Sequence, residues 1–494
     1  MLLMLLFFFG KNIKAQDMLG VTLGNYSGVT SLMVNPAMIA NTRYYLDINL
    51  VSADFFFKNN FAYIPGSDIT IYKIIRDPNS IPTYEPRGLN FKYYDNKDLK
   101  FTTISSKIMG PSAMFQYGKH AFALSTSFQV FSNANRIPYE MPLLGYYEMD
   151  YPELYGVNFK DYDISQTAAA WMDLGLSYAY TLYEYMDQKI TIGLTLKYIW
   201  SYSGFYVEAN NIDYMVVNDS TMNIHNMNAS VAFALPLDYN EPDQMMNDPF
   251  FKGHGFGADL GVVYVKKKSV DIERWNDLCE QQFDDYVFRI GASILDLGSI
   301  TYKNNAQLHS YDDVSVYWQN FDTINYSNLN QLMSDLSMVF YNGDPNASYR
   351  ADHFTLGLPT AVSVQADVNV YKDFYASGYW IHPLQFNLHA MRRAALVAVV
   401  PRYETKNLEF SLPVSLFEYK YPRVGLSARF WFVTIGTDRL GTWLGLANLD
   451  GMDFYASIKF GFGKGQCHSK FKGACNDEKY TRKSKKLRNK NNLF

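Results

Sequence analysis

Apolar and polar residues alternate strictly in many segments of this chain. In residues 453–463, one face of the predicted strand carries Phe454, Ala456, Ile458, Phe460 and Phe462, and the other carries Tyr455, Ser457 and Lys459. Because successive side chains of a strand point to opposite faces, this segment has an apolar face for lipid and a polar face for a lumen. About 9 to 11 residues suffice to cross a bilayer at a tilt, so the pattern predicts a transmembrane β-strand.

The clearest predicted hairpin covers residues 171–200, where two long alternating segments meet at a turn over residues 185–187. Its strands are longer than those of most soluble sandwiches. The same pattern occurs at 43–57, 107–117, 121–133, 255–266, 286–295, 361–371, 373–384, 394–404, 406–418 and 422–434, with further pieces at 60–64, 88–104, 204–217 and 222–235. We therefore predict an all-β fold, a transmembrane antiparallel β-barrel of about 14 strands spanning residues 43–463.

Three long interruptions, at residues 134–166, 236–253 and 304–352, are rich in Asn, Asp, Tyr and Pro. Membrane barrels keep their periplasmic turns short and enlarge the opposite side, so we expect these segments to be long extracellular loops. Residues 17–42 precede the first clear strand, and Pro36 cannot donate a hydrogen bond to a strand ladder. This segment could form a turn at the periplasmic rim or a plug inside the lumen.

The composition argues against a helical membrane protein. The chain is 17% aromatic and contains 40 tyrosines, yet its mean hydropathy is only -0.18. Outer-membrane barrels place amphipathic rings at both membrane interfaces, and their alternating strands keep the mean hydropathy low. We therefore expect the protein to lie in a bacterial outer membrane, in contact with its lipid.

Both ends of the chain differ from the predicted barrel. Residues 1–9 are an apolar run too short to span a membrane, and Ala15 and Gln16 follow, so we interpret residues 1–16 as a signal peptide. Residues 464–494 contain ten Lys or Arg and two acidic residues, and this +8 leaves -12 for the rest of a chain of net charge -4. We expect a basic periplasmic tail that is solvated or contacts an anionic partner such as peptidoglycan, and no contact with nucleic acid.

The cysteines and histidines suggest no cofactor and no catalytic centre. Cys279, Cys467 and Cys475 lack the spacing of a metal site, so we expect neither a metal nor another cofactor. A disulfide between Cys467 and Cys475 could form in an oxidising envelope compartment. The eight histidines form no recognisable motif with an acid and a nucleophile, and we therefore expect a protein without enzymatic activity.

Charged residues within the predicted strands should face the lumen, because Arg or Lys facing lipid near the midplane costs roughly 2 to 4 kcal/mol. By alternation these residues are Asp47, Asp173, Lys189, Lys197, Asp259, Arg289, Asp367, Arg429 and Lys459. They could line a polar channel or hydrogen-bond a plug, and the mixture of both signs favours the plug. Inward glycines would let a plug or a ligand approach the wall: Gly193, Gly255, Gly257, Gly261 and Gly291.

Two sequence elements resemble a known group of outer-membrane proteins. Asn35, Pro36 and Ala37 resemble the amino-terminal element of the long-chain fatty-acid transporter (FadL-like) superfamily, which includes the PorV-like barrels of Bacteroidota. Residues 255–264 and 290–298 each contain Asp-Leu-Gly and are similar to paired strands of an uncharacterised Bacteroidota outer-membrane family in that group. The resemblance implies a 14-stranded barrel whose amino-terminal segment partly plugs the lumen, with Asn35, Pro36 and Ala37 as a plug or rim motif. The basic tail departs from this family pattern.

Two hypotheses about function follow. The first is passive transfer or binding of small hydrophobic molecules, with the lumen residues and the amino-terminal segment as a gate. The alternative is a structural or interaction barrel without enzymatic activity, associated with envelope machinery such as type IX secretion or with surface attachment. The first requires a hydrophobic ligand, whereas the second requires protein partners for the long loops or the tail.

Overall fold

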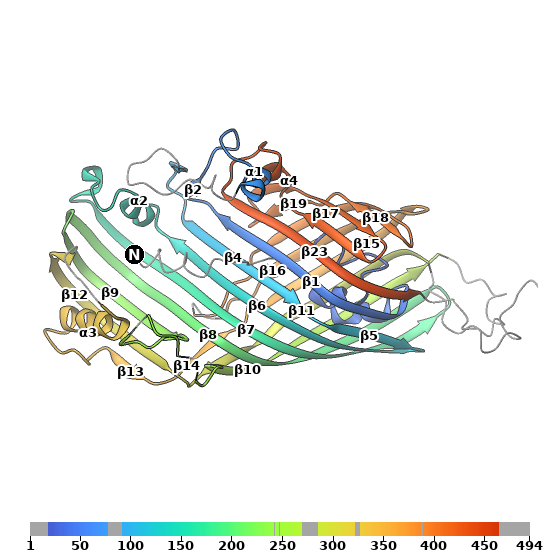
Figure 1. The fold of residues 1–494 in the computed structure, drawn as a ribbon, viewed down its shortest axis with the longest axis horizontal. Helices are drawn as coiled ribbons and strands as arrows, with labels where there is room; N and C mark the ends of the chain where they lie inside the picture. Colours follow the sequence, from blue (N-terminus) through green and yellow to red (C-terminus); the bar gives the residue numbers. More distant parts are fainter. Residues whose placement is uncertain are drawn as a thin grey trace, which may run out of the picture.

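The computed structural model describes residues 18–77, 91–241, 243–246, 248–268, 285–321, 327–386 and 389–463. Its main element is one large antiparallel sheet that closes on itself (Figure 1). Closure occurs at β1 (Tyr44–Asn59), which pairs with β23 (Gly451–Gly463) on one side and with β4 (Lys100–Met109) and β5 (Ser112–Tyr117) on the other. The chain therefore forms the predicted closed barrel of 14 antiparallel strands.

The first five barrel strands are long. They are β1, the pair β4 and β5, β6 (His120–Ile137), β7 (Asn158–Tyr185) and β8 (Gln188–Asn218). The predicted strand 107–117 is wrong in its bounds, because Gly110 and Pro111 interrupt the ladder there. The predicted pieces 189–200 and 204–217 are one continuous strand, β8, which extends well past the length needed to cross a bilayer.

The next three barrel strands are each assembled from separate segments. β9 (Thr221–Ala234) and β10 (Gly253–Lys267) pair with successive parts of β8 and so form one barrel strand. β11 (Tyr286–Tyr302) continues into β12 (Ala306–Gln319), and the following strand consists of β13 (Tyr349–Ala351), β14 (Phe354–Gly357) and β15 (Ala361–Tyr371).

This arrangement corrects the predicted loops. Residues 236–253 interrupt a single barrel strand instead of joining two, because Pro236 and Pro249 cannot continue the ladder. The range 304–352 contains β12, β13 and α3 (Leu329–Phe340), and the range 134–166 contains the ends of β6 and β7. The polar and tyrosine-rich composition of these strand extensions resembles that of loops, which is why the predicted loops are wrong here.

The last six barrel strands are shorter than β7 and β8. They are β16 (Phe374–Pro383), β17 (Leu396–Glu404), β18 (Leu408–Ser411) with β19 (Val414–Phe417), β20 (Tyr421–Val424) with β21 (Leu426–Phe430), β22 (Val433–Thr437) and β23. Pro413 and Gly425 mark the interruptions within two of them. The barrel wall is consequently much taller along β7 and β8 than along β16 to β22 (Figure 1).

An apolar belt surrounds the barrel on its outer face. Large apolar side chains of the strands are exposed there, among them Phe256 at 71% and Leu176 at 62%. Tyr185 lies at one edge of the belt and Tyr198 at the other, as expected of aromatic side chains at the two membrane interfaces. An exposed apolar surface of this extent is the lipid-facing surface of a membrane-spanning barrel.

Within the described residues, no helix has both the length and the apolar composition needed to span a membrane. The short helices are η1 (Gly28–Met33), η2 (Pro36–Ala40), α1 (Ile71–Arg76), α2 (Glu140–Tyr146), η4 (Pro152–Leu154) and α4 (Leu440–Trp443). Beyond the belt, the ends of β7, β8, β9 and β12 form with α2 and α3 an extension that we call the cap. A small sheet of β2 (Ala62–Tyr63) and β3 (Lys92–Tyr93) lies beside it.

The two rims of the barrel have connections of different length. At the rim where β1 begins, two residues join β5 to β6, β7 to β8 and β15 to β16, whereas 18 residues join β10 to β11. At the opposite rim, long connections join β1 to β4, β6 to β7, β12 to β13 and β16 to β17. We call the first the plug rim, because η1 and η2 lie beside it (Figure 1).

Candidate functional site: the plug and its docking wall

Residues 18–42, which we call the plug, lie inside the barrel. One group of their buried apolar side chains packs against inward residues of β1, β5, β6, β7 and β23. A second group packs against inward residues of β10, β11 and β15 to β17. The plug therefore contacts nearly the whole circumference of the wall near the plug rim.

Asn35 is the central polar residue of the plug. Its Oδ1 accepts a hydrogen bond from the backbone N of Ala37 at 2.9 Å, which caps η2, and Pro36 occupies the first position of that helix. Its Nδ2 donates to the carbonyl oxygens of Val262 at 3.2 Å and Ala292 at 3.3 Å. One side chain thus fixes both the local turn and its position against β10 and β11.

Three wall glycines make room for this turn. A Cβ on Gly193 would lie 2.4 Å from the backbone N of Ala37, and a Cβ on Gly261 would lie 2.1 Å from Oδ1 of Asn35. A Cβ on Gly291 would lie 2.9 Å from Nδ2 of Asn35. Separations below 3.0 Å exclude any larger residue unless the plug moves, so these glycines are required by the close approach of the plug.

Asp47 and Lys459 hold η1 against the strands where the barrel closes. Oδ2 of Asp47 accepts from the backbone N of Val29 at 2.8 Å. Nζ of Lys459 donates to the carbonyl oxygen of Tyr26 at 2.8 Å and also to that of Ser27. Both charged groups are buried, and their hydrogen bonds go to backbone groups of the plug.

Lys189 and Arg289 bind the end of the plug that precedes β1. Nζ of Lys189 donates to the carbonyl oxygen of Ala40 at 3.0 Å, and Nη1 of Arg289 donates to that of Asn41 at 3.1 Å. Arg289 also donates to the carbonyl oxygen of Leu23 and pairs with Asp367 at 2.9 Å. These two strand residues therefore contact the plug at both ends of η1 and η2.

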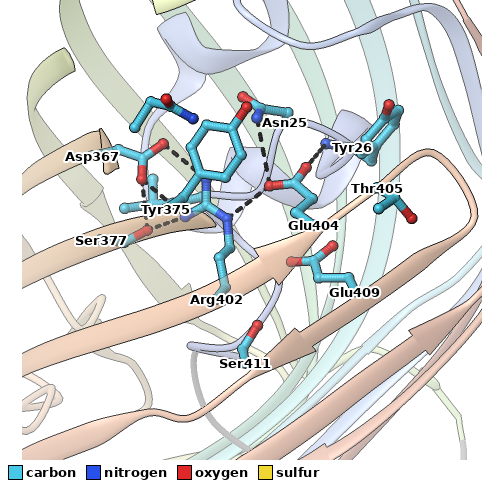
Figure 2. A network of polar contacts seen from close by, with 12 residues as sticks. Asn25, Tyr26, Asp367, Tyr375, Ser377, Arg402, Glu404, Thr405, Glu409 and Ser411 are labelled. Carbon is cyan, nitrogen blue, oxygen red and sulfur yellow. Dashed lines mark hydrogen bonds and ion pairs between the residues drawn. The ribbon is translucent and has the colours of Figure 1, made fainter. Parts of the chain in front are cut away.

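A buried ion network connects the plug to the short wall. Figure 2 shows Arg402 of β17 between Asp367 and Glu404, with Nη1 and Nη2 each 2.9 Å from a carboxylate oxygen of Asp367 and Nε 2.7 Å from Glu404. Glu404 in turn accepts from the backbone N of Tyr26 at 3.2 Å and from Asn25 at 3.5 Å. A bidentate guanidinium of this kind fixes its partners in one geometry.

The remaining predicted residues also lie on the inner face but bind other strand residues. Asp173 accepts from Ser127 at 2.6 Å and from Gln129 at 2.7 Å. Lys197 pairs with Asp259 at 2.8 Å and with Asp296 at 2.6 Å. Nε of Arg429 donates to Glu409 at 3.0 Å, and its guanidinium lies 4.9 Å from the ring centroid of Tyr26 in the plug.

Sequence analysis missed Arg402, Glu404 and Glu409. The signal was present for the first two, since charges two residues apart in a strand share a face and a lipid-facing pair would be costly. It was obscured because both faces of β17 are otherwise apolar, from Leu396 to Val400. Their partners, the backbone of Tyr26 and the side chain of Asp367, come from distant parts of the chain.

Several predictions fall outside the described residues. These are the signal peptide at 1–16, the disulfide between Cys467 and Cys475, the third cysteine Cys279 and the basic tail at 464–494. In the described ranges, no group of three His, Cys, Asp or Glu side chains is arranged to hold a metal ion. The contacts described above are therefore hydrogen bonds, ion pairs and apolar packing between the plug and the wall.

An apolar outer belt, a closed wall and an internal plug define a membrane-spanning β-barrel of the outer-membrane type, occupied by its own amino-terminal segment. The chain belongs to a family described as a family of unknown function (DUF5723), whose model matches residues 36–438. No curated protein matches the chain.

Several solved structures resemble this chain. A TodX monoaromatic hydrocarbon channel mutant has 8% identity and a TM-score of 0.43, covering 91% of this chain and 99% of that chain. A Pseudomonas aeruginosa FadL homologue has 11% identity and a TM-score of 0.41, covering 92% and 99%. The Ralstonia pickettii toluene transporter TbuX has 8% identity and a TM-score of 0.39, covering 91% and 99%. At these TM-scores, the functions of the three proteins are not carried over to this chain.

Proposed function

We propose that this protein is an outer-membrane passage for small hydrophobic molecules, closed at rest by the plug. The observation that carries the proposal is an apolar inner wall next to a plug that is attached to it by noncovalent polar contacts. The wall supplies a path for an apolar molecule, and the plug is the part of the passage that can move.

The apolar inner wall lies between the plug and the cap. On β8, Ile199 lies further from the plug rim than Gly193, which contacts the plug. Inward side chains at this height form one buried apolar cluster that includes Phe131, Trp171, Ile199, Tyr302, Phe354 and Leu356. A small apolar molecule can enter this cluster at little cost in free energy. Its own van der Waals contacts with the wall would replace the side-chain contacts that it disrupts, and it gives up no hydrogen bonds to water.

The attachment of the plug is compatible with release. Besides apolar packing, its contacts with the wall are hydrogen bonds such as that of the Lys459 ammonium group to the backbone of Tyr26. A hydrogen bond with a charged partner typically contributes about 1.5 to 3 kcal/mol net, because water can replace either partner. Water entering from the plug rim could therefore satisfy these groups once the plug is displaced.

The rims indicate an orientation for the passage. Apart from the 18-residue connection of β10 to β11, the connections at the plug rim are short turns, and the other long connections lie at the opposite rim. This distribution supports the plug rim as the periplasmic end of the barrel. In this orientation an incoming molecule meets the cap first, then the apolar inner wall, and the plug last. The plug would thus control exit to the periplasm.

Entry of the apolar dye N-phenylnaphthylamine into cells that carry the full-length protein in their outer membrane tests the proposal. Deletion of residues 18–42 should increase the entry rate several-fold. Gly261→Val should do the same, because its side chain cannot coexist with Asn35 in the docked plug. Heat-dependent gel mobility would establish that each barrel is folded.

Gly378→Val is the matched control, since a Cβ at Gly378 has no atom within 4 Å, and it should leave dye entry unchanged. Unchanged dye entry in both folded plug variants would contradict the proposal. The alternative role in secretion or surface attachment is favoured by no specific contact in the described part of the chain, and we do not propose it.

A further inference from the structure

The connection between β16 and β17 turns into the barrel. Its described residues 389–395, which we call the inner segment, include four that are buried: Ala390, Met391, Ala394 and Ala395. The backbone of Ala390 forms a parallel bridge with Gly357 of β14, and the backbone N of Met391 donates to the carbonyl oxygen of Gly357 at 3.0 Å. The segment therefore runs along the inner wall and not outward from the rim.

Contacts of the inner segment reach distant barrel strands. The ring of His389 stacks on Tyr206 of β8 at a centroid distance of 5.4 Å, although two barrel strands separate β8 from the strand that contains β14. At its other end, Ala394 packs with Phe56 of β1 and Phe417 of β19, whose rings are 5.0 Å apart. Such contacts can form only through the interior, so the segment crosses the lumen.

Ion pairs anchor this crossing to the wall. Nη1 and Nη2 of Arg392 are each 2.7 Å from a carboxylate oxygen of Glu418, which also accepts from the backbone N of Ala395 at 3.1 Å. Arg393 lies 3.4 Å from Asp296, the same carboxylate that pairs with Lys197. Directly before these anchors in the chain, Met391 belongs to the apolar cluster of the inner wall.

We propose that the inner segment is a second barrier, which keeps the passage closed to water and ions after the plug has moved but lets small apolar molecules through. This inference rests on the proposed function. The plug and the inner segment then act in series, and the selectivity for apolar molecules is determined at Met391 and its neighbours on the wall.

The physical reason is the apolar surface at the crossing. A narrow constriction lined by apolar side chains empties of water, and an ion cannot cross it without losing its hydration shell. An apolar molecule has no such shell to lose and can replace contacts among the apolar side chains. The ion pairs of Arg392 and Arg393 keep the segment across the lumen, so removing them should weaken the barrier to ions.

Ion conductance in planar bilayers and dye entry in cells, measured on the same variants, test this proposal. Gly261→Val releases the plug, and Gly357→Val displaces the inner segment, because the new Cβ would lie 2.9 Å from Cβ of Ala390. R392Q/R393Q is a second release variant that adds no steric clash. Gly378→Val again serves as the control for a strand valine.

We expect Gly261→Val alone to raise dye entry with little ion conductance. Adding either inner-segment variant should raise the conductance by about tenfold or more, as expected when an apolar constriction opens. The proposal of a second barrier is wrong if Gly261→Val alone conducts ions as well as the combined variants do. It is also wrong if neither inner-segment variant raises the conductance. If none of the folded variants raises dye entry, the proposed passage itself fails.

Discussion

The plug end and the cap end of this barrel follow the same strand alternation but use their inward positions differently. Near the plug rim, apolar inward side chains pack against the plug, and charged, polar and glycine positions lie among them. Several of the charged residues bind backbone groups of the plug, as Asp47 and Lys459 do. In the cap, inward residues such as Phe159, Ile212 and Tyr214 pack mainly with one another and with α2. The difference follows from what each end encloses.

The plug consists of turns and two short 3-10 helices, so many of its backbone groups lack partners within the plug. Buried backbone groups without partners are costly, and the wall supplies polar side chains to satisfy them. The cap, in contrast, encloses side chains of β-strands. The backbone N–H and C=O groups of these strands already form hydrogen bonds within the sheet. Some of the inward charged residues therefore lie where the wall meets the irregular backbone of the plug, as Asp47, Lys189 and Lys459 do.

The largest expected effect lies in the ion network at the plug end. Arg402→Leu would leave Asp367 and Glu404 buried without their shared cation, and we expect a loss of about 3 to 5 kcal/mol in the free energy of unfolding. Urea unfolding of the refolded barrel measures this loss. The control is Arg350→Leu on β13, whose ion pair with Asp312 of β12 in the cap, at 3.1 Å, is exposed. It should cost at most about 1 kcal/mol, and equal losses would contradict the comparison.

A smaller effect is expected where the plug approaches the wall most closely. Gly193→Ala places a Cβ 2.4 Å from the backbone N of Ala37, and backbone atoms can yield only if the plug shifts. We expect docking of the plug to weaken by about 1 to 3 kcal/mol, seen as faster hydrogen exchange throughout residues 18–42. Gly378→Ala should leave exchange unchanged. Normal protection of the plug in folded Gly193→Ala would show that the close approach is not required.

Removal of the Asn35 side chain should have a milder effect. Asn35→Ala loses the cap of η2 and the donor to Val262 and Ala292, whose carbonyl oxygens lie within the strand ladder. We expect a cost of about 1 to 2 kcal/mol, concentrated in exchange of the amides of η2. Asn35→Asp restores the cap but not the donor, so it should recover only part of the protection. Full recovery would assign the whole effect to the cap.

The smallest expected effect is a pH dependence confined to the cap. Burial of His309 of β12, beyond the apolar belt, lowers its pKa to about 4 from the usual value near 6.5. The unfolded chain then binds more protons between these values, so the stability that depends on the neutral ring is complete above pH 6.5 and decreases as the pH falls towards 4. The protection factors of amides in β12 and α3, which correct the exchange rates for the slower intrinsic exchange at low pH, should therefore decrease from pH 7 to pH 5.

His309→Gln supplies the comparison for this effect. The ring of His309 stacks on Phe233 and bonds Ser348 at 3.0 Å, so the variant should be less stable at pH 7. Its difference from the parent protein should shrink at pH 5, where the parent loses the contribution of the neutral ring. A difference that is constant with pH would show that protonation of His309 does not affect the cap.

The alternation of residues predicted the barrel and its number of strands, because the energetic cost of exposing a charge to lipid acts on each strand separately. It also predicted inward glycines such as Gly193, whose role is to admit the plug. It could not predict that β9 and β10 form one barrel strand, because this depends on which part of β8 each one meets. The partners of Arg402 and the inward turn of the inner segment depend on the same long-range pairing.

The closing pair of β1 and β23 has a consequence for how the protein is made. Lys459 of β23 donates a hydrogen bond to the carbonyl oxygen of Tyr26, 433 residues earlier in the chain. The plug therefore reaches this native partner only after the last strand has been synthesised and has joined the barrel. Contacts over such sequence separations form slowly. The assembling wall must therefore close around a segment synthesised long before its final contacts exist, which makes plug docking one of the last steps of maturation.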